Sequence, residues 1–422
     1  MCKPMHLLIA VLFSVLAGMP AWAQPGAMES ADLVIRTGRV FDGTDWRSDL
    51  TIVIAGDRVL EITNQATRYQ GRVELDASAW TVIPGLIDAH MHILDPSSEV
   101  AVTPWVLEQL EQALRAGVTT IQSTSDVTED IVELRSRIEA GLVQAPRLFV
   151  TGSLIGAVGG SRSLRCGPGT VRCNVSEVAN GAEVQAVVAQ LASAGVDAVK
   201  LLVDHNFENT LTPSLVRDII EAAHGHGLRV FGHIDYAADA RAAVEAGLDG
   251  LVHPVPWRTG PVDAVAELLA QRAIPVTTTL SLRAPYLTDG VMTTPWGIRY
   301  PDDRFRRLQH GLAVVRAMHE AGVPLVAGTD NSLRSHRVPA QERYIRELQL
   351  LVEAGLSTTE ALQAATLNAA GFLGKPDLGA IAPNKIADLV ILTGDPERNV
   401  LELENVLIVV KAGQIVVDNR GE

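Results

Sequence analysis

An apolar run that begins at Pro84 ends in two histidines one residue apart, His90 and His92. On a β-strand, side chains two residues apart project to the same side, so both imidazoles can face one point. Imidazole is a common ligand of zinc and related metals. Because neighbouring histidines also occur without a metal, the pair predicts a metal site only if other ligand side chains reach the same place.

Further side chains of metal-ligand type interrupt apolar segments later in the chain: Lys200, His233, His253 and Asp330. Lys200 is the unusual member, because burial disfavours a charged amine and lowers the pKa of lysine. Its side chain either reaches solvent, pairs with a carboxylate, or reacts as the neutral amine with carbon dioxide. The resulting carbamate is anionic and can bridge two cations.

The segments that carry these residues belong to a series of strand-like runs alternating with amphipathic helices. Eight candidate strands are residues 86–90, 119–122, 147–150, 198–203, 229–233, 250–253, 276–280 and 325–330. Helical stretches lie at 108–116, 184–194, 213–224, 238–246, 261–272 and 305–321. Eight such units favour an α/β fold, a (β/α)₈ TIM barrel over residues 84–377, with a doubly wound open sheet as the alternative. Catalytic groups of such barrels lie at the carboxyl ends of the strands, where the candidate ligands fall.

Both ends of the chain outside this region contain short, partly alternating segments separated by turn residues. They are residues 31–36, 51–54, 58–62 and 72–76 near the beginning, and 387–392, 406–411 and 414–417 near the end. We expect residues 30–83 and 378–420 to share one small β-sandwich domain.

The composition is that of a large globular protein. The 422 residues are 47% hydrophobic and carry a formal net charge of −14 at pH 7. Acidic and basic residues are interspersed, whereas nucleic acids and anionic membranes select basic faces. We therefore expect a small-molecule substrate rather than either of these partners, and a homo-oligomer remains open.

The first 23 residues have the features of a secretory signal peptide. Lys3 precedes an apolar segment at 7–17, and Ala21-Trp22-Ala23 supplies the small residues read by signal peptidase. The apolar segment is too short for an ordinary membrane-spanning helix. We expect cleavage before Gln24 and a periplasmic or secreted protein.

Two cysteines remain after this cleavage, Cys166 and Cys173, and they bracket a loop rich in turn residues. In an oxidising compartment the spacing favours a disulfide, and the alternative is a pair of free thiols. No second pair of ligand residues accompanies them at a spacing suited to zinc, so we do not expect these cysteines to bind zinc.

Together these residues resemble the amidohydrolase superfamily, in its binuclear branch of imidazolonepropionase-like and Xaa-Pro dipeptidase-like enzymes. The resemblance extends from residue 31 to about residue 419. Its most specific marks are residues 84–92, Val199-Lys200, Gly232-His233, Leu251-Val252-His253, Ala327-Gly328-Thr329-Asp330 and residues 386–390.

The resemblance implies two divalent metal ions. His90, His92 and Asp330 would hold the buried ion, His233 and His253 the more exposed one, and N6-carboxylated Lys200 both. This mixture of imidazole and carboxylate ligands fits zinc best, and manganese, cobalt and iron also accept it.

The implied activity is hydrolysis of an amide bond in a dipeptide or an N-acyl amino acid by a hydroxide that bridges the metals. Asp330 would accept the proton of the attacking water and deliver it to the leaving amine. An alternative is hydrolysis of a cyclic amide, a lactone or a xenobiotic amide or ester at the same centre. A one-metal deaminase is disfavoured because it would lack Lys200, and a scaffold without chemistry would have lost ligands.

Three residues are candidates for substrate contact. Arg162 follows a double glycine and could hold a free carboxylate through a bidentate contact, as this region does in the family. Tyr236 follows His233 by three residues and either contacts substrate or packs under its loop. His205 lies in the loop after the fourth strand. In contrast, His224 and the histidine two residues after it end a helix, which places that pair at the opposite face.

Overall fold

The computed structural model describes residues 28–64, 68–95, 100–160, 173–255, 262–288, 291–295, 302–333 and 338–421. The predicted signal peptide (residues 1–23), Arg162 and Cys166 lie outside these ranges. Within them, no helix has both the length and the apolar character needed to cross a membrane.

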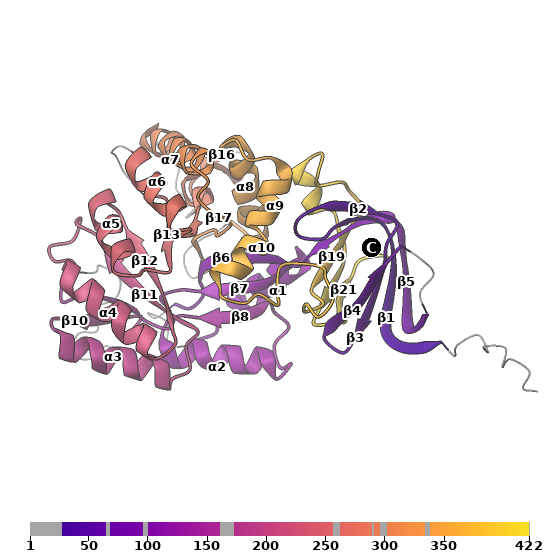
Figure 1. Ribbon diagram of the computed structural model, residues 1–422, viewed down its shortest axis with the longest axis horizontal. Coiled ribbons are helices and arrows are strands. Elements are labelled where there is room, and N and C mark those ends of the chain that lie inside the picture. Colours follow the sequence, from indigo (N-terminus) through magenta and orange to yellow (C-terminus); the bar gives the residue numbers. More distant parts are fainter. Residues whose placement is uncertain are drawn as a thin grey trace, which may run out of the picture.

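Strands from both ends of the chain form one mixed sheet, at the right of Figure 1. Its path is β21-β20-β19-β5-β1-β3-β4, and β2 pairs with β1. The strands are β1 (Glu29–Phe41), β2 (Trp46–Ser48), β3 (Thr51–Ala55), β4 (Arg58–Thr63), β5 (Tyr69–Pro84), β19 (Leu389–Leu392), β20 (Val406–Lys411) and β21 (Gln414–Asp418).

The described strands are hydrogen-bonded into one sheet rather than two, yet residues from both ends of that sheet share one hydrophobic core, which includes Ile54 of β3 and Val410 of β20. The two ends are connected through β5, which runs for 16 residues. It pairs in parallel with β1 along most of that length, and its last residues pair with β19 in antiparallel fashion. A long strand thus joins the segments from the two ends of the chain, and the sandwich form of the domain that they share stays a prediction.

The remainder of the chain alternates strands and helices. Its strands are β6 (Leu86–His92), β7 (Val118–Ser123), β8 (Arg147–Val150), β9 (Leu154–Ala157), β10 (Val175–Val178), β11 (Ala198–Val203), β12 (Arg229–Ile234), β13 (Gly250–Val252), β14 (Val276–Thr277), β15 (Tyr286–Thr288), β16 (Val291–Thr293), β17 (Leu325–Val326) and β18 (Asn331–Ser332). Its helices are α1 (Pro104–Arg115), α2 (Thr128–Glu139), α3 (Gly181–Ser193), α4 (Pro213–Gly225), α5 (Ala237–Glu245), α6 (Asp263–Gln271), α7 (Asp302–Glu320), α8 (Ala340–Glu353), α9 (Thr358–Ala364) and α10 (Leu367–Phe372). Two 3₁₀ turns are η1 (Leu280–Arg283) and η2 (Val400–Glu404).

All but two of these strands form two parallel sheets, β10-β9-β11-β12-β13-β14-β17 and β18-β6-β7-β8, and β15 and β16 form a separate antiparallel pair. The prediction of an α/β fold with parallel strands is therefore confirmed, whereas a single closed barrel sheet is not present among the described strands. The eighth candidate strand is divided, so that β17 pairs with β14 and β18 pairs with β6. Backbone hydrogen bonds still join the sheets, from Ala89 N–H to the Ala327 carbonyl (3.1 Å) and from Asp197 N–H to the Val150 carbonyl (2.8 Å).

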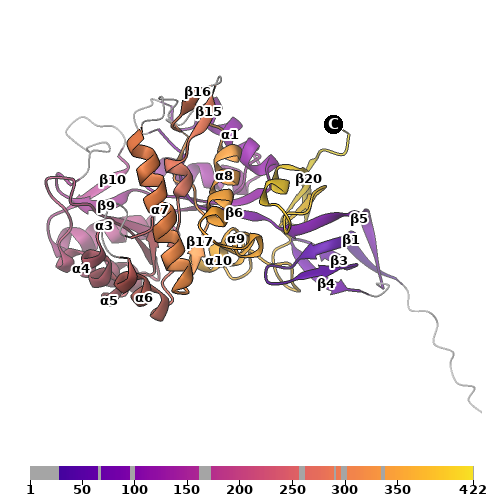
Figure 2. The same cartoon turned by 90° about the horizontal axis from the view of Figure 1, so that it is seen from above.

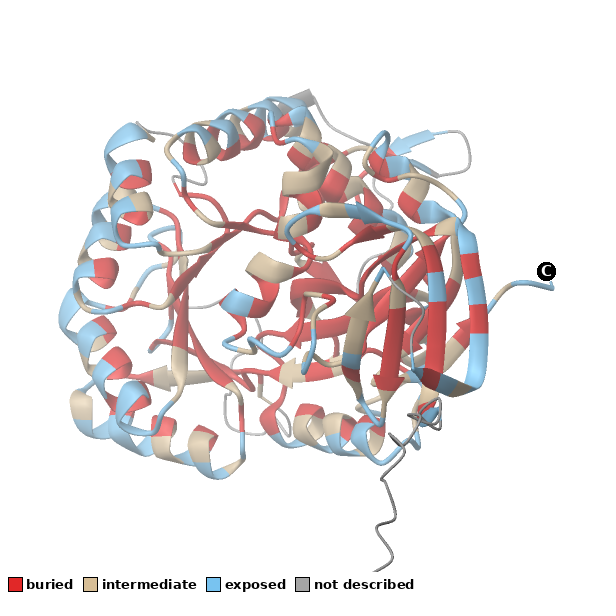
Figure 3. Cartoon of the chain, turned by 45° about the vertical axis from the view of Figure 1, so that its right-hand side comes forward, coloured by how far each residue is buried: buried red, intermediate tan, exposed pale blue. Residues whose placement is uncertain are grey.

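The helices lie outside the strands and turn one face toward them, which is clearest from above in Figure 2 and from the burial colours of Figure 3. Helix starts are well defined: Thr103 and Thr212 each cap a helix whose first residue is proline. Fixed helix starts hold the loops that leave the carboxyl ends of the strands.

One close approach between strands requires glycine. A Cβ atom at Gly328 would lie 3.0 Å from the Cβ atom of His90. The glycine therefore allows the segment that carries Asp330 to run directly beside the strand that carries His90.

Candidate metal centre

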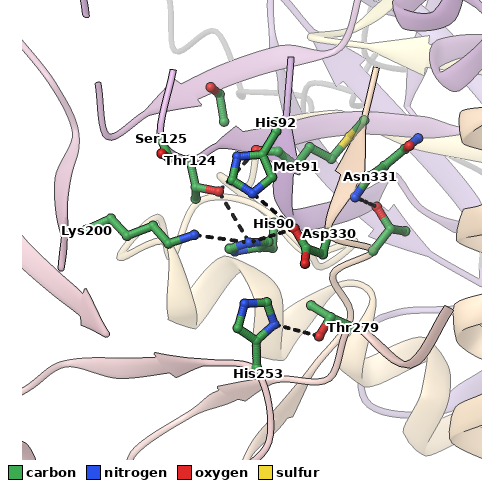
Figure 4. Close-up of polar contacts among 12 residues, drawn as sticks. His90, Met91, His92, Thr124, Ser125, Lys200, His253, Thr279, Asp330 and Asn331 are labelled. Atoms are coloured by element: carbon green, nitrogen blue, oxygen red, sulfur yellow. Dashed lines mark hydrogen bonds and ion pairs between the residues drawn. The ribbon is translucent and has the colours of Figure 1, made fainter. Parts of the chain in front are cut away.

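Three side chains from two neighbouring segments converge at the carboxyl end of β6 (Figure 4). The Nε2 atoms of His90 and His92 lie 3.4 and 3.0 Å from Oδ1 of Asp330. All three donor atoms lie within 4.8 Å of one another. Two imidazoles and one carboxylate at these separations form a group that could hold a divalent ion.

Lys200 and His253 lie beside this group. The Lys200 Nζ atom is 3.3 Å from Nε2 of His90, and both residues are buried. The ring of His253 packs edge to face against those of His90 and His233, with centroids 5.1 and 4.5 Å apart. The structure therefore brings the six predicted ligand residues into one neighbourhood.

The protonation states suit metal binding, which requires neutral imidazoles and an ionised carboxylate. Burial and the nearby Lys200 amine lower the pKa of His90 to about 3, and burial holds the pKa of His253 well below its usual value. Burial alone would raise the pKa of Asp330, but hydrogen bonds with His90 and His92 hold it well below its usual value. Burial lowers the pKa of Lys200 to about 8.

A further observation on His90 indicates that these residues suit a metal ion. Among the described residues, the buried Nδ1 atom of His90 has no hydrogen-bond partner, although buried polar atoms are rarely left unpaired. The Nε2 atom of the same ring is crowded by Lys200 Nζ, Asp330 Oδ1 and Thr124 Oγ1. A ring with these surroundings is suited to ligation rather than to a structural hydrogen bond.

His233 belongs to a second ligand group that sequence reasoning missed, with Asp204 after β11 and Asp235 after β12. Its Nε2 atom lies 3.3 Å from Oδ1 of Asp235. The side-chain amide of Asn206 donates to both carboxylates. Asp204 directly follows the predicted strand 198–203 and Asp235 lies two residues after the predicted strand 229–233, so the rule that located His233 could have located them as well.

Two further buried carboxylates support the first group. Asp88 accepts hydrogen bonds from the backbone N–H of His90 (3.2 Å) and from Thr329. Asp126 accepts from the N–H groups of Ile93 and Leu94, both at 2.9 Å, and so fixes the chain just after His92. Burial raises the pKa of Asp88 to about 7 and raises that of Asp126.

The backbone at this rim adopts a rare conformation in four places. Ser125, His253, Thr279 and Asp330 have φ of 62°, 77°, 44° and 52°. A non-glycine residue in this region costs of order 1 kcal/mol or more and persists only where the surroundings enforce it. Strained positions cluster at functional sites, and here they coincide with two of the predicted ligands.

The predicted substrate contacts lie farther out. His205 and Tyr236 form an edge-to-face pair with centroids 5.3 Å apart, and both are exposed. Nε2 of His205 is 2.9 Å from Oδ2 of Asp239. By contrast, His224 near the end of α4 lies 2.9 Å from Oδ2 of Asp249, at the amino end of β12 and away from the ligand groups.

Cys173 forms a disulfide. Its pairing with Cys166 stays a prediction, because Cys166 lies outside the described residues.

The sequence matches the Amidohydrolase family over residues 81–416. The chain belongs to the amidohydrolase family. A protein of Mycobacterium tuberculosis described only as uncharacterized is 28% identical over 351 residues, which are 79% of this chain and 84% of that protein.

Solved structures share this amidohydrolase's fold. A Xaa-Pro dipeptidase with methionine bound in its active site has a TM-score of 0.75 and 24% identity, over 91% of this chain and 99% of that one. Molinate hydrolase has a TM-score of 0.76 and 22% identity, over 93% of this chain and 96% of that one. The family resemblance seen in the sequence is therefore confirmed, and the protein is an enzyme of hydrolase type.

Proposed function

We propose that this amidohydrolase uses two divalent metal ions to hydrolyse an amide bond in a dipeptide or an N-acyl amino acid. One observation carries the proposal: His90, His92 and Asp330 converge with Lys200 and His253 in a buried, strained rim. The Xaa-Pro dipeptidase that shares the fold supports a peptide-like substrate. We further propose that the two parallel sheets function as one barrel whose carboxyl rim carries the site.

His90, His92 and Asp330 would hold the inner ion, and His233 and His253 the outer one. When bound, the ions lower the pKa of a water molecule and polarise the carbonyl of the substrate. Zinc is the proposed metal because imidazole and carboxylate ligands suit it.

Lys200 would join the two positions as its N6-carboxylate. With a pKa of about 8, roughly one lysine in ten carries a neutral amine at pH 7, and only this form reacts with carbon dioxide. The reaction forms a bond between the Nζ atom and the carbon of carbon dioxide and releases one proton. The product exchanges a buried cation for an anion beside His90.

Asp330 is the proposed proton carrier. Its carboxylate is ionised and is oriented by two imidazoles, so it can accept the proton of the attacking water. As the C–O bond forms and the C–N bond breaks, the same group delivers that proton to the leaving nitrogen. Tyr236 and His205, with Arg162, are the proposed contacts for the free carboxylate of the substrate.

A second candidate function is hydrolysis of a cyclic amide, a lactone or a xenobiotic amide or ester at the same centre. It is favoured by the similarity in fold to molinate hydrolase. The TM-score for that structure is 0.76, against 0.75 for the Xaa-Pro dipeptidase. The two candidates share every metal ligand and differ only in what fills the outer rim.

The test is a substrate panel applied to metal-stripped protein with and without added zinc. The panel contains dipeptides, N-acyl amino acids, lactams, lactones and aryl amides, and Asp330→Asn serves as the matched inactive control. Zinc-dependent cleavage of dipeptides or N-acyl amino acids supports the first candidate, whereas selective cleavage of the other compounds supports the second. Equal turnover by Asp330→Asn and the parent protein contradicts both.

We also propose that the signal peptide is removed before Gln24, that the mature protein is periplasmic or secreted, and that Cys166 pairs with Cys173. The mass of the protein recovered from a periplasmic fraction, before and after reduction and alkylation, tests all three. Retention of residues 1–23, or free Cys166, contradicts the corresponding proposal.

A further inference from the structure

Helix α8 carries two charged side chains on the face that it turns into the protein. Arg343 and Glu347 are four residues apart, so they lie on one side of the helix. Both have no exposed surface. A fully buried arginine and glutamate need specific polar partners, and these partners lead to the candidate metal centre.

Arg343 holds the two neighbours of Asp330. Its Nη1 donates to Oδ1 of Asn331 (2.5 Å) and its Nη2 donates to the carbonyl of Thr329 (3.0 Å). From the opposite side, Asp88 accepts from the N–H (3.0 Å) and the hydroxyl (2.7 Å) of Thr329. The residues on both sides of Asp330 are therefore fixed, which explains how its left-handed backbone is maintained.

Glu347 acts on the segment after β14. It accepts from the hydroxyl of Thr278 (2.6 Å) and from the N–H groups of Leu280 (3.0 Å) and Ser281 (2.6 Å). These residues surround Thr279, whose backbone is also left-handed. The Thr279 hydroxyl lies 2.8 Å from Nδ1 of His253 and so sets the orientation of that ring.

We propose that Arg343 and Glu347 are positioning residues. Arg343 holds Asp330 at the inner metal position, and Glu347 holds His253 at the outer one, so a single helix positions a ligand of each ion. The inference rests on the proposed function only in taking these two residues as metal ligands. Partners of this kind, which hold a ligand without touching the metal, typically contribute 10–100-fold to metal affinity.

The test measures zinc affinity of the full-length, metal-stripped protein by competition with a chromophoric chelator, without substrate. Arg343→Met is expected to weaken the tighter site by about 10–100-fold, and Arg343→Lys, which keeps the charge but not the planar fork, by less. In an Asp330→Ala background, Arg343→Met should change the remaining affinity by less than about twofold, because the ligand that it positions is gone.

Glu347→Gln provides the parallel experiment at the other position. The amide NH₂ of the new side chain would face a backbone N–H donor, so we expect zinc affinity to fall by about 10-fold. In a Thr279→Val background, which lacks the hydroxyl that orients His253, the same substitution should cause no further loss. If Arg343→Met does not fold, Arg343→Lys and Glu347→Gln carry the test, since both nearly preserve volume.

Arg147→Met is the control, because it too removes a guanidinium paired with a carbonyl or carboxylate oxygen. Arg147 is only partly buried and pairs with Asp388 at 2.5 Å, at the start of β8 and away from the ligands. The substitution should lower the melting temperature and leave zinc affinity unchanged. Unchanged affinity in the α8 variants, or an equal loss with and without Asp330, overturns the inference. Because no substrate is used, absence of amide hydrolysis leaves this result intact and counts against the proposed function alone.

Discussion

The two ligand groups at the rim differ in how they are held. The inner group of His90, His92 and Asp330 is surrounded by buried side chains that fix its backbone on several sides. The outer group of Asp204, His233 and Asp235 combines His233, near the end of β12, with one acid directly after β11 and one directly after β12. The side-chain amide of Asn206 links the two acids.

The inner group is thus held by contacts from several distant segments of the chain, whereas Asn206 links the two acids of the outer group from within the loop after β11. A preorganised site reduces the reorganisation needed for binding and chemistry. Effects of substitution should therefore decline from the inner group outward.

The largest effect is expected at the inner group. Asp330→Asn removes both the charge that faces His90 and His92 and the proposed proton carrier, so kcat should fall by about 10³-fold or more. Steady-state rates on the best substrate of the panel measure the loss, and circular dichroism shows whether the fold is kept. A folded variant with the kcat of the parent protein would contradict the expectation that substitutions in the inner group have the largest effect.

Lys200, which lies beside His90, should show the next largest effect. Lys200→Ala should lower kcat by about 100-fold, because the proposed bridging ligand is lost. In the parent protein, burial lowers the pKa of Lys200 to about 8, so the neutral amine becomes more abundant as pH rises toward that value.

Reactivation of metal-stripped protein by zinc at a fixed concentration of dissolved carbon dioxide should therefore accelerate with pH up to about 8 and level off above it. Stopped-time assays of regained activity measure this rate. A rate that climbs with constant slope to pH 10 would contradict the pKa, and reactivation without carbon dioxide would contradict the carbamate.

The outer group should respond more weakly. Asp235→Asn keeps the shape but removes a charge near His233, so zinc affinity at the weaker site should fall by about 10-fold while the tighter site is unaffected. Isothermal titration with zinc separates the two sites. An equal loss at both sites would mean that the groups form a single unit.

The smallest functional effect is expected where the rim meets solvent. Tyr236→Phe removes one hydroxyl that could bind the substrate, so KM should rise by about 10-fold while kcat changes little. His224→Ala is the control, because His224 pairs with Asp249 away from both groups, and its kinetics should match the parent protein. A kcat effect of Tyr236→Phe larger than its KM effect would place the tyrosine nearer the chemistry.

Sequence reasoning could locate much of this arrangement because the signals were local. Apolar runs bounded by turn residues predicted the strands that became β6, β7, β8, β11, β12 and β13. A polar residue within, at the end of or just after such a run marked each candidate ligand. The parallel pairing then brought residues as distant as His90 and Asp330 together, as the barrel rule requires.

The remainder depended on contacts that no local pattern carries. The division of the eighth strand follows from the left-handed backbone at Asp330, which Arg343 maintains from another helix. Helix α8 itself was not among the predicted helices, and two charged residues, Arg343 and Glu347, lie on the face that it turns into the protein. The acids Asp204 and Asp235 were not predicted as ligands, because their approach to each other depends on contacts between two loops, which Asn206 makes.

The most direct test of the account is a crystal structure of the zinc-loaded protein with anomalous diffraction collected at the zinc edge. We predict two peaks, one within ligand distance of His90, His92 and Asp330 and one beside His233 and His253, with carboxylated Lys200 between them. A zinc-loaded, active enzyme without a peak at His90, His92 and Asp330 would contradict it.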